Sequence, residues 1–242
     1  MRIALISDLH ANEVALRAVL ADIARVGCDE IICLGDVATL GPAPHEVIGM
    51  LRDRRCRTIL GNHDAFMLEP DLIHTYTEAA VVVDAVDWCR ERLSADEIDW
   101  IRGFVPTLEV PLDGTAKLFL FHGTPRSHME DLLATTPPDV VDEMLSGHRA
   151  TIVAGGHTHL QMMRQHRGML IVNPGSVGLP FKEYVAGKAP TLLRHAEYAM
   201  VEANGNGVGV QLHRVPVDTR AMATAVAATD NPLREGLLHE YR

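Results

Sequence analysis

The chain has 242 residues, of which 47% are hydrophobic and 22% are charged, a balance typical of a globular protein with one large domain. Its formal net charge of −10 argues against a protein that coats long nucleic acid, because such proteins carry a basic face. No apolar run approaches the roughly 18 residues that a membrane-spanning helix needs, and the chain begins with a short apolar strand rather than a signal-peptide core.

The four cysteines follow the pattern of buried free thiols. None of Cys28, Cys33, Cys56 and Cys89 forms a C-x-x-C pair, and three of them lie in or beside apolar runs. Free thiols persist in a reducing compartment, so we expect a cytoplasmic protein.

The first sixty residues alternate between strands and helices. We expect strands over 2–7, 30–34 and 57–60, and helices from the cap at Asn12 to Gly27 and over 45–54. A strand, a helix and a second strand within about 35 residues indicate a right-handed parallel crossover.

Each of these three strands ends in a short polar cluster. The clusters are Asp8-Leu9-His10, Gly35-Asp36 and Gly61-Asn62-His63-Asp64. Because side chains alternate along an extended backbone, we expect Asp8 and His10 to point the same way. The carboxyl ends of parallel strands meet at one edge of a sheet, so the three clusters are expected to face a common crevice.

Residues 65–103 predict a helical insert. An apolar stripe recurs at helical spacing over 82–89, and Ser94 with Glu97 forms a capping box for a second helix. The insert either lies over the polar edge or packs beside the sheet, and both interpretations remain open.

The remaining chain is expected to be rich in strands. We expect strands over 107–112, 117–121, 151–154, 161–167, 169–172, 197–203 and 208–215, a helix from Pro137-Pro138 to Leu145, and a short Ala-rich helix followed by a polar tail. Two of these strands also end in polar clusters, which are His122-Gly123 and Gly156-His157-Thr158-His159.

The five clusters together supply side chains that can bind metal ions. The candidates are Asp8, His10, Asp36, Asn62, His122, His157 and His159. A single histidine or aspartate is more often a core, surface or capping residue, but this set recurs at the ends of five strand-like runs. Mixed carboxylate, imidazole and amide donors suit Mn²⁺, Fe²⁺, Zn²⁺ or Ni²⁺ better than Mg²⁺ or Ca²⁺. The sequence therefore predicts a transition-metal site.

In this order the five clusters resemble the motif set of the calcineurin-like metallophosphoesterases. The set spans residues 7–159, and the segments 35–44 and 173–178 are similar to the small bacterial phosphodiesterase branch. The resemblance implies an α/β fold of two packed mixed β-sheets flanked by helices. We expect one such domain over residues 1–242, with 65–103 as its insert.

The resemblance also implies a role for each candidate. One ion would be held by Asp8, His10, Asp36 and His159, and a second by Asp36, Asn62, His122 and His157, with Asp36 as the bridge. A hydroxide between the ions would attack phosphorus in line, and His63 would serve as acid or charge stabiliser beside the leaving oxygen. Many family members carry an aspartate three residues after the bridging one, which is thought to orient the catalytic histidine. This chain has Thr39 there, so the group that orients His63 is unassigned.

Substrate contacts are less well marked. Arg126 follows His122 closely and Lys182 follows the turn at 173–176, so either could grip a phosphate group, although a solvated surface charge is the plainer interpretation. His128 and Phe181 are weaker candidates. Homo-oligomer formation is left open.

The leading hypothesis is a metal-dependent phosphodiesterase that uses two divalent ions, preferably Mn²⁺, to hydrolyse small or nucleotide-like phosphodiesters. A phosphomonoesterase with the same site is the alternative. A non-catalytic metal-binding scaffold is a third hypothesis, since the retromer coat contains a subunit that resembles this family but lacks the catalytic histidine. A DNA nuclease is disfavoured by the acidic charge and by the lack of a basic, aromatic binding stretch.

Overall fold

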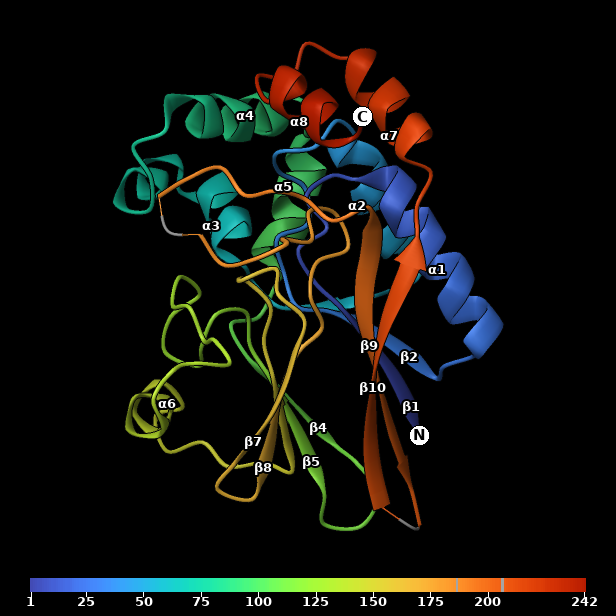
Figure 1. Cartoon of the computed structure of the whole chain (residues 1–242), viewed down its shortest axis with the longest axis vertical. Helices are drawn as coiled ribbons and strands as arrows, with labels where there is room; N and C mark the ends of the chain where they lie inside the picture. The colour runs from blue at the N-terminus through green and yellow to red at the C-terminus, as the bar shows by residue number, and fades with distance from the viewer. Residues whose placement is uncertain (186, 206) are drawn as a thin grey trace.

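The computed structural model describes residues 1–185, 187–205 and 207–242, and two mixed five-stranded sheets form its centre (Figure 1). The first sheet has the strand order β10-β9-β1-β2-β3 and the second has the order β4-β5-β6-β8-β7. The strands are β1 (Arg2–Ile6), β2 (Glu30–Cys33), β3 (Arg57–Thr58), β4 (Leu108–Pro111), β5 (Lys117–Leu120), β6 (Ile152–Ala154), β7 (Met162–His166), β8 (Met169–Asn173), β9 (His195–Asn204) and β10 (Gly207–Pro216).

The helices α1, α2 and α6 begin and end close to the predicted boundaries. They are α1 (Glu13–Val26), α2 (Pro44–Asp53), α3 (Asn62–Leu68), the 3₁₀ helix η1 (Pro70–Thr75), α4 (Ala80–Glu91), α5 (Ala95–Arg102), α6 (Pro138–Met144), α7 (Thr219–Ala227) and α8 (Arg234–Glu240). The predicted caps are present. The Asn12 side chain accepts a hydrogen bond from the backbone of Ala15 at 3.1 Å, and Ser94 and Glu97 form the capping box of α5.

Parallel pairing brings the ends of the strands to one edge. In the first sheet β1, β2 and β3 are parallel, with Ile6 opposite Cys33 and Cys33 opposite Thr58. In the second sheet β5, β6 and β8 are parallel, with Leu120 opposite Ala154. The segments that follow these strands therefore leave each sheet at a common level.

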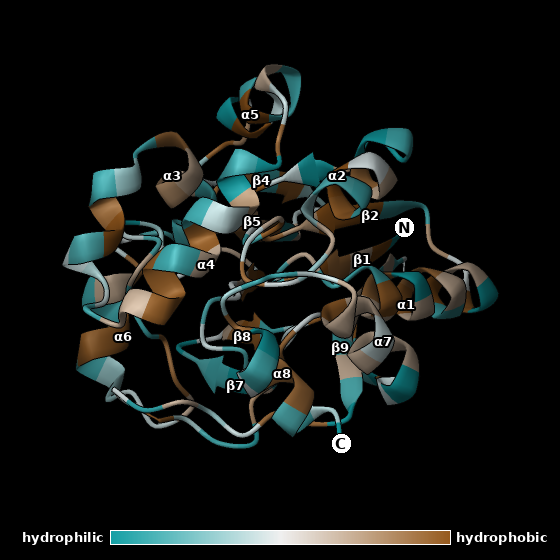
Figure 2. Ribbon diagram, turned by 90° about the horizontal axis from the view of Figure 1, so that it is seen from above, coloured by the Kyte–Doolittle hydropathy of each residue, from teal (hydrophilic) through white to brown (hydrophobic). Residues whose placement is uncertain are grey.

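Side-chain alternation along β1 shows how the layers are built. Ile3 and Leu5 lie in the apolar layer between the two sheets, together with residues of β5, β6 and β9. Ala4 and Ile6 point to the other face, where they pack against α1 and α2. Helix α6 covers the outer face of the second sheet, and Figure 2 shows α1 and α6 on opposite sides of the sheets. The predicted sandwich of two mixed sheets flanked by helices is confirmed.

Residues 65–103 pack in two places and also reach the polar edge. Trp88 and Ile101 join the core that contains α1 and α2, while Phe66 packs with residues of α7 and α8. The ring of Tyr76 lies 6.1 Å from the rings of both His63 and His157. The segment thus combines the two interpretations that the sequence left open. Its status as an insert within one domain stays a prediction.

The expected polar tail is wrong. Helix α8 lies in this region, and its Leu237 packs with Tyr241 and with Met222 of α7 in a shared apolar cluster. Leu233, Leu237 and Tyr241 are spaced by four residues, so they form one apolar stripe on an otherwise polar helix. Most other residues of this segment are polar, so its composition led to the expectation of a polar tail.

The cysteines are free, as expected, whereas the expected cytoplasmic location is not tested. All four cysteines are free, with Cys33 and Cys89 buried and Cys28 and Cys56 half-buried. Within the described ranges, helices long and apolar enough to cross a membrane are absent. The cytoplasmic location stays a prediction.

Candidate metal centre

The polar segments that follow the strands are joined by backbone hydrogen bonds. The Asp8 N–H donates to the Gly35 carbonyl at 3.0 Å, which links the ends of β1 and β2. The Gly156 N–H donates to the His122 carbonyl at 2.8 Å, which links the ends of β5 and β6. These bonds fix the backbone of each polar segment relative to the neighbouring segment, and so fix where its side chains begin.

Asp64, which the sequence analysis did not assign, fixes the segment around Asp36. Its carboxylate accepts backbone hydrogen bonds from Asp36 at 2.7 Å, Val37 at 2.9 Å and Gly61 at 3.0 Å. Burial and the nearby Asp36 carboxylate raise the pKa of Asp64 to about 7, despite these three donors. The position of Asp64 within the motif 61–64 was the signal that could have identified it.

The backbone at five of the candidate ligands is left-handed, although we expected an extended backbone at residues 8–10. Positive φ angles occur at Asp8 (53°), His10 (44°), Asp36 (57°), His157 (68°) and His159 (57°). Residues other than glycine adopt this conformation only where the surrounding structure holds them there, and such positions concentrate at functional sites. Asp8 and His10 do converge on one donor group, as expected, but left-handed turns bring them together and not the alternation of an extended strand.

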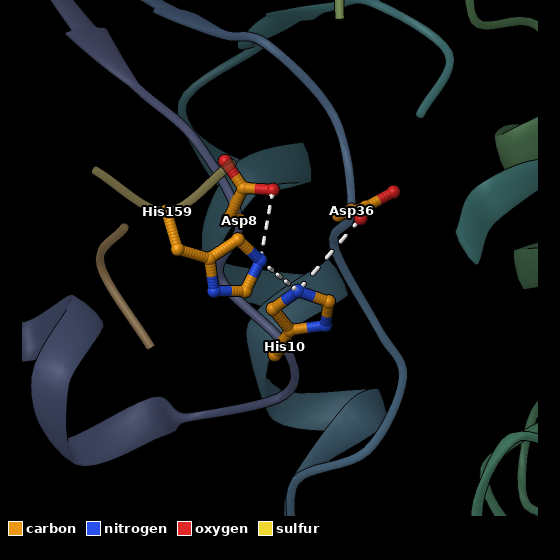
Figure 3. Close-up of side chains that lie close together, drawn as sticks. All are labelled: Asp8, His10, Asp36 and His159. Carbon is orange, nitrogen blue, oxygen red and sulfur yellow. Dashed lines mark hydrogen bonds and ion pairs between the residues drawn. The ribbon is translucent and has the colours of Figure 1, made fainter. Parts of the chain in front are cut away.

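Four buried side chains form the first donor group, which consists of Asp8, His10, Asp36 and His159 (Figure 3). Their ligand atoms lie within 4.8 Å of one another. His159 Nε2 lies 3.3 Å from Asp8 Oδ1, and His10 Nε2 lies 3.7 Å from Asp36 Oδ2. The Nε2 atoms of His10 and His159 are only 3.0 Å apart.

The second donor group consists of Asp36, Asn62, His122 and His157. Ligand atoms of Asp36, His122 and His157 lie within 4.8 Å of one another. Asn62 Oδ1 lies 3.0 Å from His122 Nε2 and 3.0 Å from His157 Nδ1. Asp36 belongs to both groups, so the two positions adjoin at this carboxylate.

The outward ring nitrogens show which atoms face the centre. His122 Nδ1 donates to the Leu34 carbonyl at 2.7 Å, and His159 Nδ1 donates to the Leu179 carbonyl at 2.6 Å. Because a carbonyl can only accept, Nδ1 carries the hydrogen in each ring. In the neutral ring Nε2 then presents a lone pair to the centre, as a metal ligand does.

Burial lowers the pKa of these imidazoles, and the neighbouring charged groups decide the direction of the net shift. Burial disfavours charge on His122, but the Asp36 and Asp8 carboxylates outweigh it and raise the pKa of His122 to about 10. Burial and the nearby His159 hold the pKa of His10 well below its ordinary value. A cation bound by His122 Nε2 would require the neutral ring, so metal and proton would compete for this nitrogen.

An unpartnered buried oxygen indicates that the donors fit a cation. Within the described residues, the buried Asp8 Oδ1 accepts no hydrogen bond, although His159 Nε2 lies 3.3 Å from it. A buried carboxylate oxygen without a donor is costly unless a cation balances it. The donor set and the orphaned oxygen therefore fit divalent metal ions.

His63 is held by packing and by its backbone. Its ring lies 5.0 Å from the His10 ring and 5.2 Å from the Phe66 ring, and its N–H donates to Asp36 Oδ1 at 2.9 Å. The Thr39 Oγ1 lies 3.2 Å from Nδ1 of His10, and among the hydrogen bonds of the described residues none joins Thr39 to His63. The ring of His63 therefore lies beside the first donor group with Nδ1 unpartnered in the described structure.

The weaker candidates lie in different surroundings. Arg126 is exposed and pairs with Glu130 at 2.6 Å. Lys182 is exposed, and its backbone N–H donates to Thr191. Phe181 packs against His159, with ring centroids 4.2 Å apart. Substrate binding by Arg126 or Lys182 stays a prediction.

Two further residues near the site were missed by the sequence analysis. Asp131 Oδ1 lies 3.4 Å from His157 Nε2, and the Tyr76 ring lies 6.1 Å from the His157 ring. Both belong to segments without hydrophobic periodicity or a motif, so the sequence carried no signal for them.

Comparisons with known proteins identify the family. Residues 1–203 match the model of the calcineurin-like phosphoesterase superfamily domain. An uncharacterised protein from Methanocaldococcus jannaschii is 29% identical over 193 residues, which cover 74% of this chain and 76% of that protein. A metallophosphoesterase structure from Sphaerobacter thermophilus is 25% identical with a TM-score of 0.75, covering 100% of this chain and 98% of that one.

A hypothetical protein from Pyrococcus horikoshii OT3 shares the fold. The TM-score is 0.82 at 18% identity, and the match covers 98% of this chain and 96% of that one. The family match, the two mixed sheets and the buried cluster of histidines and aspartates agree with one another. The chain belongs to the calcineurin-like phosphoesterase superfamily.

Proposed function

We propose that this protein is a phosphodiesterase that uses two divalent metal ions to hydrolyse small or nucleotide-like phosphodiesters. The observation that carries the proposal is the position of Asp36, which belongs to both donor groups and can bridge two ions. Membership of a phosphoesterase family supports hydrolysis of a phosphate ester, and the buried donors support divalent cations.

Each donor group would hold one ion. The first ion would be bound by Asp8, His10, Asp36 and His159, and the second by Asp36, Asn62, His122 and His157. When bound, the two ions supply an activated water and neutralise the phosphoryl oxygens. His63 would hydrogen-bond the leaving oxygen, because its buried ring lies beside the first donor group with Nδ1 unpartnered in the described structure.

The surroundings of the donor groups favour a diester over a monoester. A monoester carries more negative charge than a diester and would gain more from an additional cation, whereas the Arg126 guanidinium is already paired with Glu130. Tyr76 and Tyr184 are 45% and 44% exposed. The Tyr76 ring lies 6.1 Å from the His157 ring, and the Tyr184 hydroxyl bonds to Asp131, which itself contacts His157. Exposed aromatic rings can stack on planar organic groups such as nucleobases. A phosphomonoesterase is the second candidate.

Mn²⁺ is the preferred metal in this proposal, with Fe, Zn or Ni as alternatives. The two donor groups combine imidazoles and carboxylates with one amide oxygen, a mixture that suits first-row transition metals. A scaffold without catalysis would not need the buried, unpartnered nitrogen of His63 beside the first donor group.

The test compares bis(4-nitrophenyl) phosphate with 4-nitrophenyl phosphate, using metal-stripped protein with and without added Mn²⁺. We expect a metal-dependent rate that favours the diester. A preference for the monoester would support the phosphatase instead. Failure to hydrolyse either ester while two ions are bound would support the scaffold.

A further inference from the structure

His157 differs from the other histidines of the donor groups in the nitrogen that it turns toward the centre. Its Nδ1 lies 3.0 Å from Asn62 Oδ1. The other three rings present Nε2 instead, namely His10, His122 and His159. The outward nitrogen of His157 is therefore Nε2, which lies on the side of the loop that contains Asp131.

The outward nitrogen of His157 also has a different partner. Its Nε2 lies 3.4 Å from Asp131 Oδ1, within ion-pair distance. The outward nitrogens of the other three rings face neutral oxygens, which belong to Thr39, Leu34 and Leu179. A carboxylate stabilises the hydrogen on an imidazole more strongly than a neutral oxygen does, and so makes the opposite nitrogen a better ligand.

Tyr184 holds the Asp131 carboxylate in place. Its hydroxyl donates to Asp131 Oδ2 at 2.8 Å, so each oxygen of Asp131 has one contact. The same stretch of chain supports the neighbouring ligand His159, through the Leu179 carbonyl at 2.6 Å and the Phe181 ring. Residues 179–184 therefore connect with both histidines of the motif 156–159.

We propose that Asp131 and Tyr184 are positioning residues for the second metal ion. Asp131 holds the hydrogen of His157 on Nε2 and leaves Nδ1 free for the ion, and Tyr184 fixes the orientation of the carboxylate. The inference rests on the proposed two-ion site. It assigns a metal-binding consequence to residues that do not themselves touch the ions.

The consequence is selective, because Asp131 contacts a ligand of the second donor group only. Replacing Asp131 by alanine is expected to lower the affinity of the second site for Mn²⁺ about 10-fold to 100-fold, which is the usual effect of losing a hydrogen-bond partner of a metal-binding histidine. Tyr184→Phe removes one hydrogen bond to Asp131 and is expected to lower the same affinity about threefold to tenfold. Asp131→Asn retains the shape but removes the charge and should fall between them. The first ion should bind as in the unmodified protein.

Tyr76 provides a matched control. It is 45% exposed against 44% for Tyr184, and its ring lies 6.1 Å from that of His157. Among the hydrogen bonds of the described residues, its hydroxyl has no partner. Tyr76→Phe therefore removes the same atom near the same ligand and should leave both metal affinities unchanged.

The experiment is a calorimetric titration of Mn²⁺ into the metal-stripped full chain, with the unfolding midpoint of each stripped variant as a check on folding. Two sites in the unmodified protein, with only the second weakened in the Asp131 and Tyr184 variants, is the expected result. Unchanged second-site affinity in Asp131→Ala, or an equal loss in Tyr76→Phe, would overturn the inference. Fewer than two sites in the unmodified protein would instead contradict the proposed two-ion centre.

Discussion

Thr39 Oγ1 lies 3.2 Å from His10 Nδ1, so this hydroxyl supports a candidate ligand of the first ion rather than the candidate acid His63. The contact resolves a question that the sequence left open. His63 is oriented by its neighbours His10 and Phe66 and by the hydrogen bond of its N–H to Asp36. The ring of His63 is thus placed by these neighbours in a chain that has Thr39, and not aspartate, three residues after Asp36.

Removing the Thr39 hydroxyl should weaken the binding of the first metal ion. Thr39→Ala leaves the outward nitrogen of His10 without its partner, and we expect about a tenfold loss of first-site Mn²⁺ affinity in a calorimetric titration. Thr39→Ser keeps the hydroxyl and should bind normally. If Thr39→Ala lowered turnover while both affinities stayed unchanged, the hydroxyl would act on His63 instead.

Replacing His63 should separate catalysis from metal binding. We expect His63→Ala to lower kcat for a diester with a poor, alkyl leaving group by about 10²- to 10⁴-fold, because protonation of the leaving oxygen is lost. The loss should be smaller for a 4-nitrophenyl diester, whose leaving group needs little protonation. Bound Mn²⁺ should be unchanged.

The exposed His239 on α8 supplies the control, and His239→Ala should retain both rates. Equal losses of turnover in His63→Ala for the two leaving groups would contradict the role of proton donor.

Gly61 lies against the shared carboxylate. A Cβ added there would meet Asp36 Oδ1 at 2.1 Å and the Asp36 nitrogen at 2.6 Å. Gly61→Ala should therefore displace the Asp36 side chain. We expect the Mn²⁺ affinity of both sites to fall by at least about tenfold in a calorimetric titration. A loss confined to one ion would show that Asp36 is not shared.

Gly49 in α2 offers the matched control, because a Cβ there would meet no atom within 4 Å. Gly49→Ala should leave metal binding intact and stabilise the protein by about 1 kcal/mol, since alanine favours a helix interior. An unfolding midpoint measured in both glycine variants separates local displacement from general destabilisation.

Stability should depend on pH through Glu197, which lies far along the chain from the ligands. Its side chain is buried, Oε2 has no partner among the described residues, and burial raises its pKa although His195 and Arg214 oppose the shift. A raised carboxyl pKa means that the neutral form is favoured in the fold. This stability is present below the unfolded-state pKa and is lost as pH rises through the folded-state pKa.

Glu197→Gln mimics the neutral form. Its unfolding midpoint should match that of the unmodified protein near pH 4 and exceed it increasingly toward neutral pH, in thermal scans of metal-stripped protein. A constant difference for Glu197→Gln across this range would contradict the argument.

The arrangement of strands and donors could be predicted because one physical rule governs both. Apolar runs form parallel strands, and the carboxyl ends of parallel strands converge, so clusters such as 8–10 and 61–64 had to meet. Family resemblance then divided the donors into two groups that share Asp36. The structure places the side chains together in those same two groups.

The remaining details depend on contacts that leave no pattern in the sequence. The left-handed backbone at Asp8 and His10 is held by hydrogen bonds to the segment after β2, which are long-range contacts. Asp131 and Tyr184 come from irregular segments, where periodicity gives no information. The partner of Thr39 is decided by side-chain positions within about an ångström.

The most direct test of the two-ion phosphodiesterase is the rate of bis(4-nitrophenyl) phosphate hydrolysis as a function of Mn²⁺ bound per chain, starting from stripped protein. The account predicts that the rate rises mainly with the second equivalent and exceeds that for 4-nitrophenyl phosphate. A rate that is complete at one equivalent, or one that does not depend on bound metal, would contradict it.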